Sequence, residues 1–155
     1  MATTDAIDLL MKDHERMRDL LGQLVDTTER RARKRKELLQ AIARELEIHG
    51  RIEEEIFYPA FCEAGAEEEE RACSEAKEEH RTMENLVIPD LEGTAPDAAE
   101  FGGRAKVLKE LVEHHADEEE EETFPRAQEI LSQDTLSELG ELMAERKQDL
   151  EAELA

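Results

Sequence analysis

The stretch LEIHGRIEEEIFYPAF, residues 46–61, carries a histidine followed four residues later by a glutamate and ten residues later by a proline. The chain repeats this spacing in HADEEEEETFP, which begins at His115. The two copies are offset by 66 residues, and the same offset relates His14 to His80. Each half of the chain therefore holds one histidine and then a His-x3-Glu pair, which indicates an internal repeat of a helical hairpin.

The four-residue spacing joins His49 to Glu53 and His115 to Glu119. Residues four apart on an α-helix lie one turn apart on the same face, so both side chains can reach one ion. One such pair arises readily by chance in an acidic chain. Two pairs in register, with four of only five histidines obeying the repeat, predict a metal site. The competing interpretation is a set of solvated histidines on acidic helices.

Composition favours a helical domain. The 155 residues are enough for one domain with a real core. Charged residues make up 40% and aromatic residues 3% of the chain, and glycine and proline are scarce. This profile is typical of a helix bundle packed on aliphatic side chains.

The formal net charge of −22 argues against nucleic acid or an anionic membrane surface as a partner. A field of this sign attracts cations, although solubility alone also explains it. No signal peptide opens the sequence, and no apolar run approaches the roughly twenty residues of a membrane span. We therefore expect a cytoplasmic protein, in which Cys62 and Cys73 are free thiols.

Apolar residues recur every three or four positions in five stretches, which predicts five helices. The expected helices are one that ends near residue 30, then 37–58, 67–88, one through 105–122, and 131–155. Short connections predict an all-α, up-down-up-down four-helix bundle over residues 1–128, with residues 129–155 as an additional C-terminal helix packed on it. Pro59 is expected to end or kink its helix, and Pro89 is expected to stop its helix.

Between these helices, the basic run 30–36 is expected to be a solvated turn and helix start. The Gly- and Pro-containing stretch 93–103 is expected to be the longest loop and a mobile lid.

Polar residues on the predicted apolar faces point to the same site. His14 lies within the apolar stripe of the first helix, where an unsatisfied imidazole is costly. Glu53 shares a face with His49, and a buried carboxylate requires a cation. Tyr58, the only tyrosine, either packs or places its hydroxyl near the site. His114 has no repeat partner and is expected at the surface or behind the ligands.

The number of predicted ligands exceeds the need of one structural zinc. Four imidazoles and two carboxylates are more than the four ligands of a tetrahedral zinc site. Carboxylates can bridge two ions, and imidazole with carboxylate suits iron or manganese. The set therefore predicts two metal ions within the bundle.

The motifs that carry these residues resemble those of the hemerythrin-like family, the HHE cation-binding domain. They are DHERM at His14, HGRIEEEIFYP at His49, EEHRTME at His80 and HHADEEEEETFP at His115. The resemblance covers residues 5–128 and implies a four-helix bundle with a non-haem di-iron centre, bridged by an oxo or hydroxo group and by carboxylates. The iron ligands that it implies are His14, His49, Glu53, His80, His115 and Glu119.

Glu84 departs from the family pattern, because hemerythrins carry a second histidine at this point of the third helix. It is either a further metal ligand or the partner of Arg18, which occupies the same place in the other half. The phrases LEIHGRIEEEIFYP and ELGELMAER are similar to those of actinobacterial hemerythrin-like proteins. That subgroup implies catalase-like breakdown of hydrogen peroxide in oxidative stress or iron homeostasis.

Two other functions remain open from the sequence. One is a non-enzymatic protein that binds, stores or senses dioxygen or iron. The other is a bundle without metal. The expected partners are iron, hydrogen peroxide and dioxygen, with no nucleic acid and no membrane.

Overall fold

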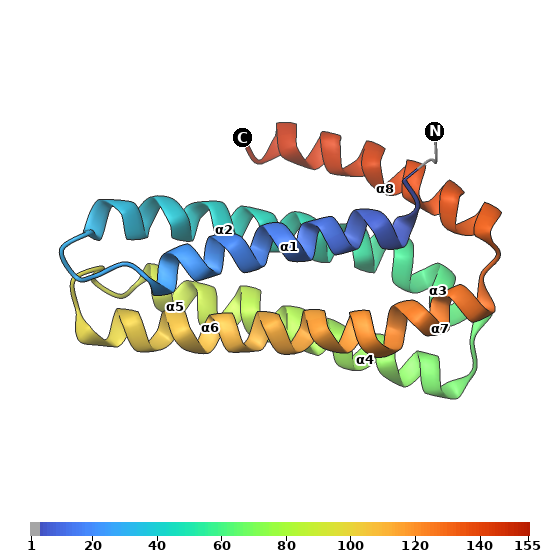
Figure 1. Ribbon diagram of the computed structural model, residues 1–155, viewed down its shortest axis with the longest axis horizontal. Coiled ribbons are helices and arrows are strands. Elements are labelled where there is room, and N and C mark those ends of the chain that lie inside the picture. The colour runs from blue at the N-terminus through green and yellow to red at the C-terminus, as the bar shows by residue number, and fades with distance from the viewer. Residues whose placement is uncertain (1–3) are drawn as a thin grey trace.

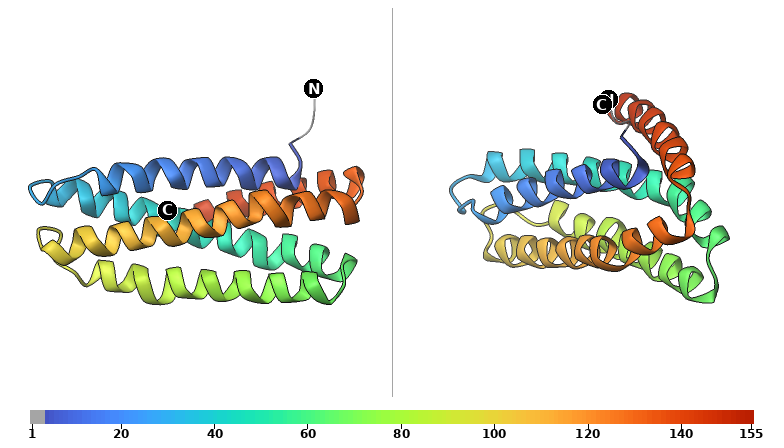
Figure 2. Two further views of the ribbon diagram at one scale, coloured as in Figure 1. Left: turned by 60° about the horizontal axis from the view of Figure 1, so that its bottom comes forward. Right: turned by 45° about the vertical axis from the view of Figure 1, so that its right-hand side comes forward.

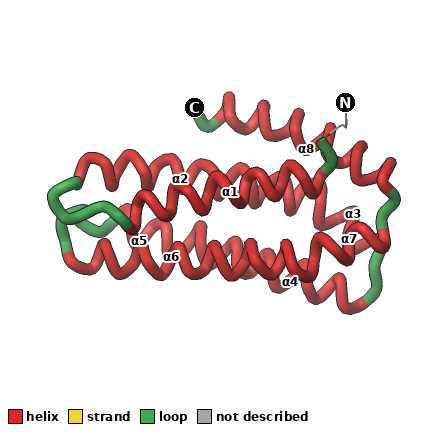
Figure 3. The backbone as a smooth tube through the Cα atoms, viewed as in Figure 1, coloured by secondary structure: helices red, strands yellow, loops and turns green. Residues whose placement is uncertain are grey.

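The computed structural model describes residues 4–155, and in this part of the chain all regular structure is helical (Figures 1 and 3). Four antiparallel helical arms form a bundle, and a further helix lies across one face. The arms are α1 (Ala6–Val25); α2 (Ala32–Ile52), η1 (Glu53–Phe57) and α3 (Tyr58–Ala64); α4 (Glu67–Thr82), η2 (Met83–Val87) and α5 (Ile88–Glu92); and α6 (Ala99–Glu118), η3 (Glu119–Thr123) and α7 (Phe124–Ile130). The additional helix is α8 (Gln133–Glu153). The prediction of an all-α bundle with a C-terminal helix is confirmed.

Three of the four arms pass through a π-helical turn before a proline. In each turn the amide just before the proline donates five residues back: Tyr58 to Glu53, Ile88 to Met83, and Phe124 to Glu119. A proline lacks the amide proton that an α-helix needs, and its ring crowds the carbonyl four residues earlier. The wider turn relieves both problems. Both arms continue past the proline, so the expectation that Pro89 stops its helix is wrong, and Pro59 does not end its helix.

The α1–α2 and α5–α6 loops lie at the same end of the bundle, on the left in Figure 1. Arg35 connects these two loops. Its guanidinium donates to the carbonyl oxygens of Thr27 at 3.0 Å and Pro96 at 2.6 Å, and it lies 5.0 Å from the ring centre of Phe101. These bonds bury Arg35, so one member of the basic run 30–36 is not solvated as expected. Helix α2 begins at Ala32, earlier than the expected start near residue 37.

The stretch 93–103 is not a loop throughout, as the sequence suggested, and its role as a mobile lid remains a prediction. Only residues 93–98 connect α5 to α6, and Gly102 and Gly103 lie within α6. Anchored by Arg35, the connection covers the end of the bundle that holds the α1–α2 turn.

Two apolar clusters fill the bundle, one toward each end. The cluster nearer the α3–α4 turn includes Leu10, Ile52, Phe57, Phe61, Phe124 and Met143. The other includes Met17, Leu21, Ile42, Leu46, Met83 and Leu108. A layer of buried histidine and glutamate side chains separates them. The three arms with a π-helical turn contribute to this polar layer close to that turn, and α1 contributes His14 from a regular α-helix.

The turn between α3 and α4 brings Cys62 and Cys73 together as a disulfide, with Cα atoms 6.7 Å apart. The expectation of free thiols is therefore wrong. Antiparallel packing of the two helices places the cysteines opposite each other, a proximity that residue spacing alone did not establish.

Helix α8 packs across α1 and α2 (Figure 2). Gly140 makes this approach possible, because a Cβ atom there would lie 2.7 Å from the carbonyl oxygen of Thr4. Arg146 of α8 pairs with Glu55 at 3.2 Å. The division into a bundle of residues 1–128 and a separate helical segment remains a prediction. Among residues 4–155, no helix combines the length and apolarity needed to cross a membrane.

Candidate metal centre

Each of the four arms supplies one buried histidine to the polar layer, and every Nε2 atom faces Glu53 or Glu119. The Nε2 atoms of His49 and His80 lie 3.0 and 3.1 Å from Glu53 Oε1, and those of His14 and His115 lie 3.1 and 3.3 Å from Glu119 Oε1. The structure thus brings together all six residues of the predicted ligand set.

The opposite nitrogen, Nδ1, of each histidine faces a second carboxylate. The distances are 3.0 Å for His49 to Asp13, 2.9 Å for His80 to Glu54, 2.7 Å for His115 to Glu79, and 3.4 Å for His14 to Glu120. We call these four the outer carboxylates. Asp13, Glu54 and Glu79 form hydrogen bonds with the Nδ1 atoms that they face, whereas Nδ1 of His14 makes none. A carboxylate that accepts from Nδ1–H leaves the Nε2 lone pair free for a metal ion.

The sequence interpretation did not identify the outer carboxylates, although the repeat contained a signal for them. Asp13 and Glu79 are related by the 66-residue offset, and so are Glu54 and Glu120. Each corresponding histidine pairs with the corresponding carboxylate, so the site has an approximate twofold relation between the halves of the chain.

The donor atoms divide into two groups that share Glu53. One consists of His14, His49, Glu53 and Glu119, and the other of Glu53, His80 and His115; within each, the ligand atoms lie within 4.8 Å of one another. Two adjoining groups with a shared carboxylate fit two ions held from the core of a four-helix bundle.

The unmet hydrogen-bonding capacity of these residues also fits a bound cation. The buried Oε2 atom of Glu53 has no hydrogen-bond partner, and neither has Nε2 of His49, whose approach to Glu53 lacks hydrogen-bond geometry. Buried polar atoms are rarely left unpaired without a functional cause. A metal ion bound between them would satisfy both atoms.

Carboxylates dominate the electrostatics of the layer. Burial lowers the pKa of His49, but Glu53 and Asp13 outweigh it and raise the pKa to about 10. Burial likewise opposes protonation of His80, yet Glu53 and Glu54 raise its pKa to about 8. The pKa of His115 is also well above its usual value, because Glu119, Glu53 and Glu79 outweigh burial. In the metal-free protein at pH 7 these imidazoles hold protons.

Metal loading at pH 7 is therefore expected to release about three protons per chain, because a metal ligand must be a neutral imidazole. Because the pKa values are raised, the number of protons released on metal binding is largest below pH 8 and falls as the pH approaches 10. The apparent metal affinity rises with pH, because fewer protons then compete with the metal. Addition of Co²⁺ to metal-free protein in weak buffer with a pH indicator measures the release. An unchanged pH during binding would contradict the protonated state of these three imidazoles.

Glu84 does not pair with Arg18, so that alternative is wrong. Arg18 instead contacts Asp117 at 2.8 Å and Glu120 at 2.5 Å. The Oε1 atom of Glu84 is buried without a hydrogen-bond partner, beside the Cα of Gly50, where a Cβ would approach it to 3.4 Å. Burial, with the charge of Glu54, raises the pKa of Glu84 to about 7. Its role as a metal ligand remains a prediction.

Two aromatic rings flank the centre at equivalent positions of the repeat. Tyr58 stacks on His80 with ring centres 5.8 Å apart, and Phe124 stacks on His14 at 5.7 Å. Only the tyrosine carries a donor, and its hydroxyl donates to Glu119 Oε2 at 2.8 Å. Tyr58 therefore places its hydroxyl at the site. His114 lies at the surface instead, within 3.6 Å of Glu79 and 3.5 Å of Glu118.

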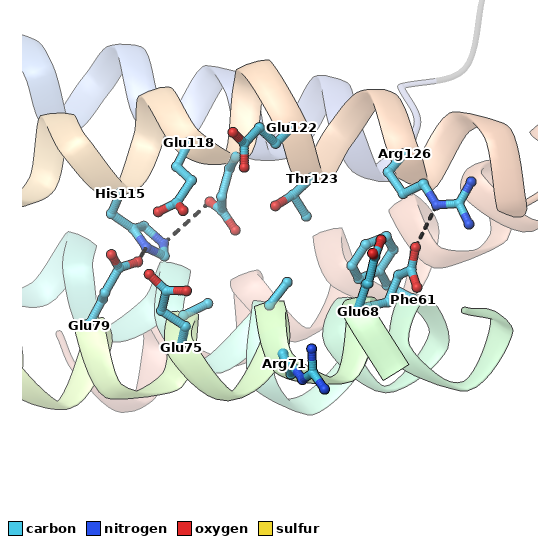
Figure 4. Close-up of a pocket in the computed structure, with 14 residues that line it drawn as sticks. Phe61, Glu68, Arg71, Glu75, Glu79, His115, Glu118, Glu122, Thr123 and Arg126 are labelled. Atoms are coloured by element: carbon cyan, nitrogen blue, oxygen red, sulfur yellow. Dashed lines mark hydrogen bonds and ion pairs between the residues drawn. The ribbon is translucent and has the colours of Figure 1, made fainter. Parts of the chain in front are cut away.

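A cavity of about 320 Å³ opens between α4 and the arm formed by α6, η3 and α7 (Figure 4). His115 and Glu119 lie on its inner wall, and Glu75, Glu118 and Glu122 line it further out. Small molecules in this cavity can approach two residues of the centre.

Comparisons with known proteins agree with this geometry. The uncharacterized proteins Rv2633c of Mycobacterium tuberculosis and Mb2666c of Mycobacterium bovis are each 30% identical to this chain over 147 residues, which is 94% of this chain and 87% of theirs. A crystal structure of a hemerythrin HHE cation binding domain-containing protein, the Rv2633c homolog from Mycobacterium kansasii, superposes with a TM-score of 0.84 at 27% identity. The match covers 99% of this chain and 90% of that one. Residues 5–127 match the family described as the hemerythrin HHE cation binding domain. With four histidines and two carboxylates at the core of its bundle, the chain belongs to the hemerythrin HHE cation-binding family.

Proposed function

We propose that the protein holds two iron ions and breaks down hydrogen peroxide. The observation that carries the proposal is the convergence of four histidine Nε2 atoms on Glu53 and Glu119. The ligands would be His14, His49, His80 and His115, with both glutamates as bridging or chelating groups. Two bound irons would supply the paired electron transfers by which two molecules of hydrogen peroxide become dioxygen and two molecules of water.

The protein residues have separate parts in this chemistry. Asp13, Glu54 and Glu79 orient the imidazoles of His49, His80 and His115 by hydrogen bonds to Nδ1. Tyr58 fixes one oxygen of Glu119 and places a hydroxyl proton at the centre. The apolar clusters on both sides of the polar layer limit access by water. The cavity beside His115 gives peroxide, a small neutral molecule, a path that its acidic walls do not repel.

The test is peroxide consumption and dioxygen release by iron-loaded protein, normalised to bound iron. We expect turnover in a 2:1 ratio of peroxide consumed to dioxygen released, and loss of turnover in His49→Ala. A stable, reversible dioxygen complex without peroxide turnover would favour oxygen carriage or sensing. Iron uptake without either reaction would favour storage. Protein without iron after anaerobic ferrous loading would exclude all three.

Tyr58→Phe is expected to retain iron but to lower peroxide turnover per iron by about tenfold, the equivalent of one hydrogen bond to a charged group. The variant removes the donor to Glu119 and keeps the ring that stacks on His80. Initial rates with iron quantified on the same samples measure the effect. Wild-type turnover in this variant would show that the hydroxyl serves packing alone.

A further inference from the structure

Asp13 connects the C-terminal helix to the metal centre. Its side chain is 3% exposed and is held from two directions. Oδ2 accepts from Nδ1 of His49 at 3.0 Å, and Oδ1 accepts from Nζ of Lys147 at 2.5 Å. The contact joins α8 to α1 across 134 residues of sequence.

Lys147 supplies what a buried carboxylate needs for a fixed orientation. A carboxylate removed from water requires a partner for each oxygen, and one left unpaired is free to turn or to take up a proton. With Oδ1 held by the ammonium group, Oδ2 stays directed at His49. The imidazole then keeps its proton on Nδ1 and directs Nε2 toward Glu53.

The other half of the repeat lacks this support. Glu79 is the repeat equivalent of Asp13 and accepts from His115 Nδ1 at 2.7 Å. Within residues 4–155, its remaining ion pair is the 3.6 Å contact to His114 at the surface, and no lysine or arginine reaches it. The two halves of the repeat therefore provide a comparison. The carboxylate behind His49 is held by a lysine, whereas the carboxylate behind His115 is not.

Two further contacts hold α8 in the position that places Lys147 beside Asp13. The close packing of Gly140 on Thr4 fixes one end, and Arg44 of α2 donates to the carbonyl oxygen of Glu151 at 2.8 Å near the other end. Yet α8 lies beyond residue 127, where the match to the family ends. Lys147 is thus contributed from outside the matched domain.

The geometry points to Lys147 as a positioning residue for the candidate metal ligand His49, acting through Asp13. The inference rests on the proposed metal centre. The inference gives α8 a part in that centre. The metal-binding position held by His14 and His49 depends on the C-terminal helix, whereas the one held by His80 and His115 does not.

The variants Lys147→Met and Lys147→Arg test this inference, with Arg146→Met as the matched control. Arg146 is the adjacent residue of α8, and its side chain is equally exposed at 27%. It pairs with Glu55 and does not contact the Lys147–Asp13–His49 chain of hydrogen bonds, which we call the relay. Co²⁺ titration of metal-free protein, followed by visible absorption, reports each binding step. We expect Lys147→Met to weaken one of two steps by up to about tenfold, the lower end of the cost of losing an outer partner such as Asp13 itself. Lys147→Arg should restore most of the affinity, and Arg146→Met should bind as wild type.

A second readout does not depend on metal. In ¹⁵N-histidine-labelled, metal-free protein, the Nδ1–H proton of His49 should give a signal protected from solvent exchange in wild type and Arg146→Met, and lost in Lys147→Met. If Lys147→Met loses this signal but the wild-type protein does not bind Co²⁺, the positioning role of Lys147 stands and the proposed metal centre is rejected. A retained signal, or tighter binding in Lys147→Met, would overturn the inference. Equal weakening of both steps would do the same, since it would indicate a general effect of charge or folding.

Discussion

Glu53→Gln is expected to abolish the two-metal centre, with an affinity loss of more than about 100-fold, beyond the cost of losing an outer partner. Glu53 is fully buried and belongs to both ligand groups. Its Oε1 atom lies within 3.0–3.7 Å of the Nε2 atoms of three histidines. Glutamine has the same shape, but it lacks the charge and would direct an NH₂ group at an ion or an imidazole. Iron content and peroxide turnover measure the effect.

The matched control is Glu121→Gln, which removes one negative charge from an exposed position of the other glutamate run. It should bind iron as wild type. Circular dichroism would establish that both variants remain helical. Two irons per chain in folded Glu53→Gln would show that this carboxylate is not shared between the ions.

Removal of the metal is expected to lower the melting temperature by roughly 10–20 °C. Two ions, each present at a hundredfold excess over its dissociation constant, would contribute about 5 kcal/mol to the free energy of unfolding. In a chain of this size each kcal/mol corresponds to roughly 2–4 °C. Without metal, the imidazoles and the two glutamates lose their bonds to the ions and keep their contacts with one another.

Thermal unfolding before and after treatment with a chelator measures this difference, and Glu53→Gln provides the control. That variant should melt at the same temperature with and without chelator, because it has no metal to lose. An unchanged melting temperature in iron-loaded wild-type protein would mean that the ions contribute little to folding.

The convergence of the four histidines with Glu53 and Glu119 could be predicted from sequence, because helical geometry acts over short distances and the repeat relates the two halves. The pairing of His49 with Glu53 follows from one turn of helix, and the offset of 66 residues identifies the corresponding pair at His115. The apolar spacing around His14 places that residue in the interior. These local rules were enough to identify the six converging residues and the bundle that carries them.

Features that depend on packing between arms were not accessible in this way. Pro59 carries a helix-ending signal, but the π-helical turn at Glu53 preserves the helix. The contact of Arg18 with Glu120, in place of Glu84, depends on how α1 packs against the arm that contains α6 and η3. The disulfide required the antiparallel turn between α3 and α4.

The role of Lys147 was the least accessible to sequence analysis. The apolar stripe of the C-terminal helix predicts that it covers the bundle, but does not predict which residue it contacts. The ion pair of Lys147 with Asp13 depends on the close packing of α8 at Gly140. In the other half of the repeat, no lysine or arginine among residues 4–155 pairs with Glu79, the equivalent of Asp13.

Anomalous diffraction at the iron absorption edge, from crystals of iron-loaded protein, tests the two-iron centre most directly. We predict two iron peaks in the polar layer, one beside His14 and His49 and the other beside His80 and His115, with Glu53 between them. A single peak with four ligands would contradict this centre, as would iron confined to the surface group of Glu79, His114 and Glu118.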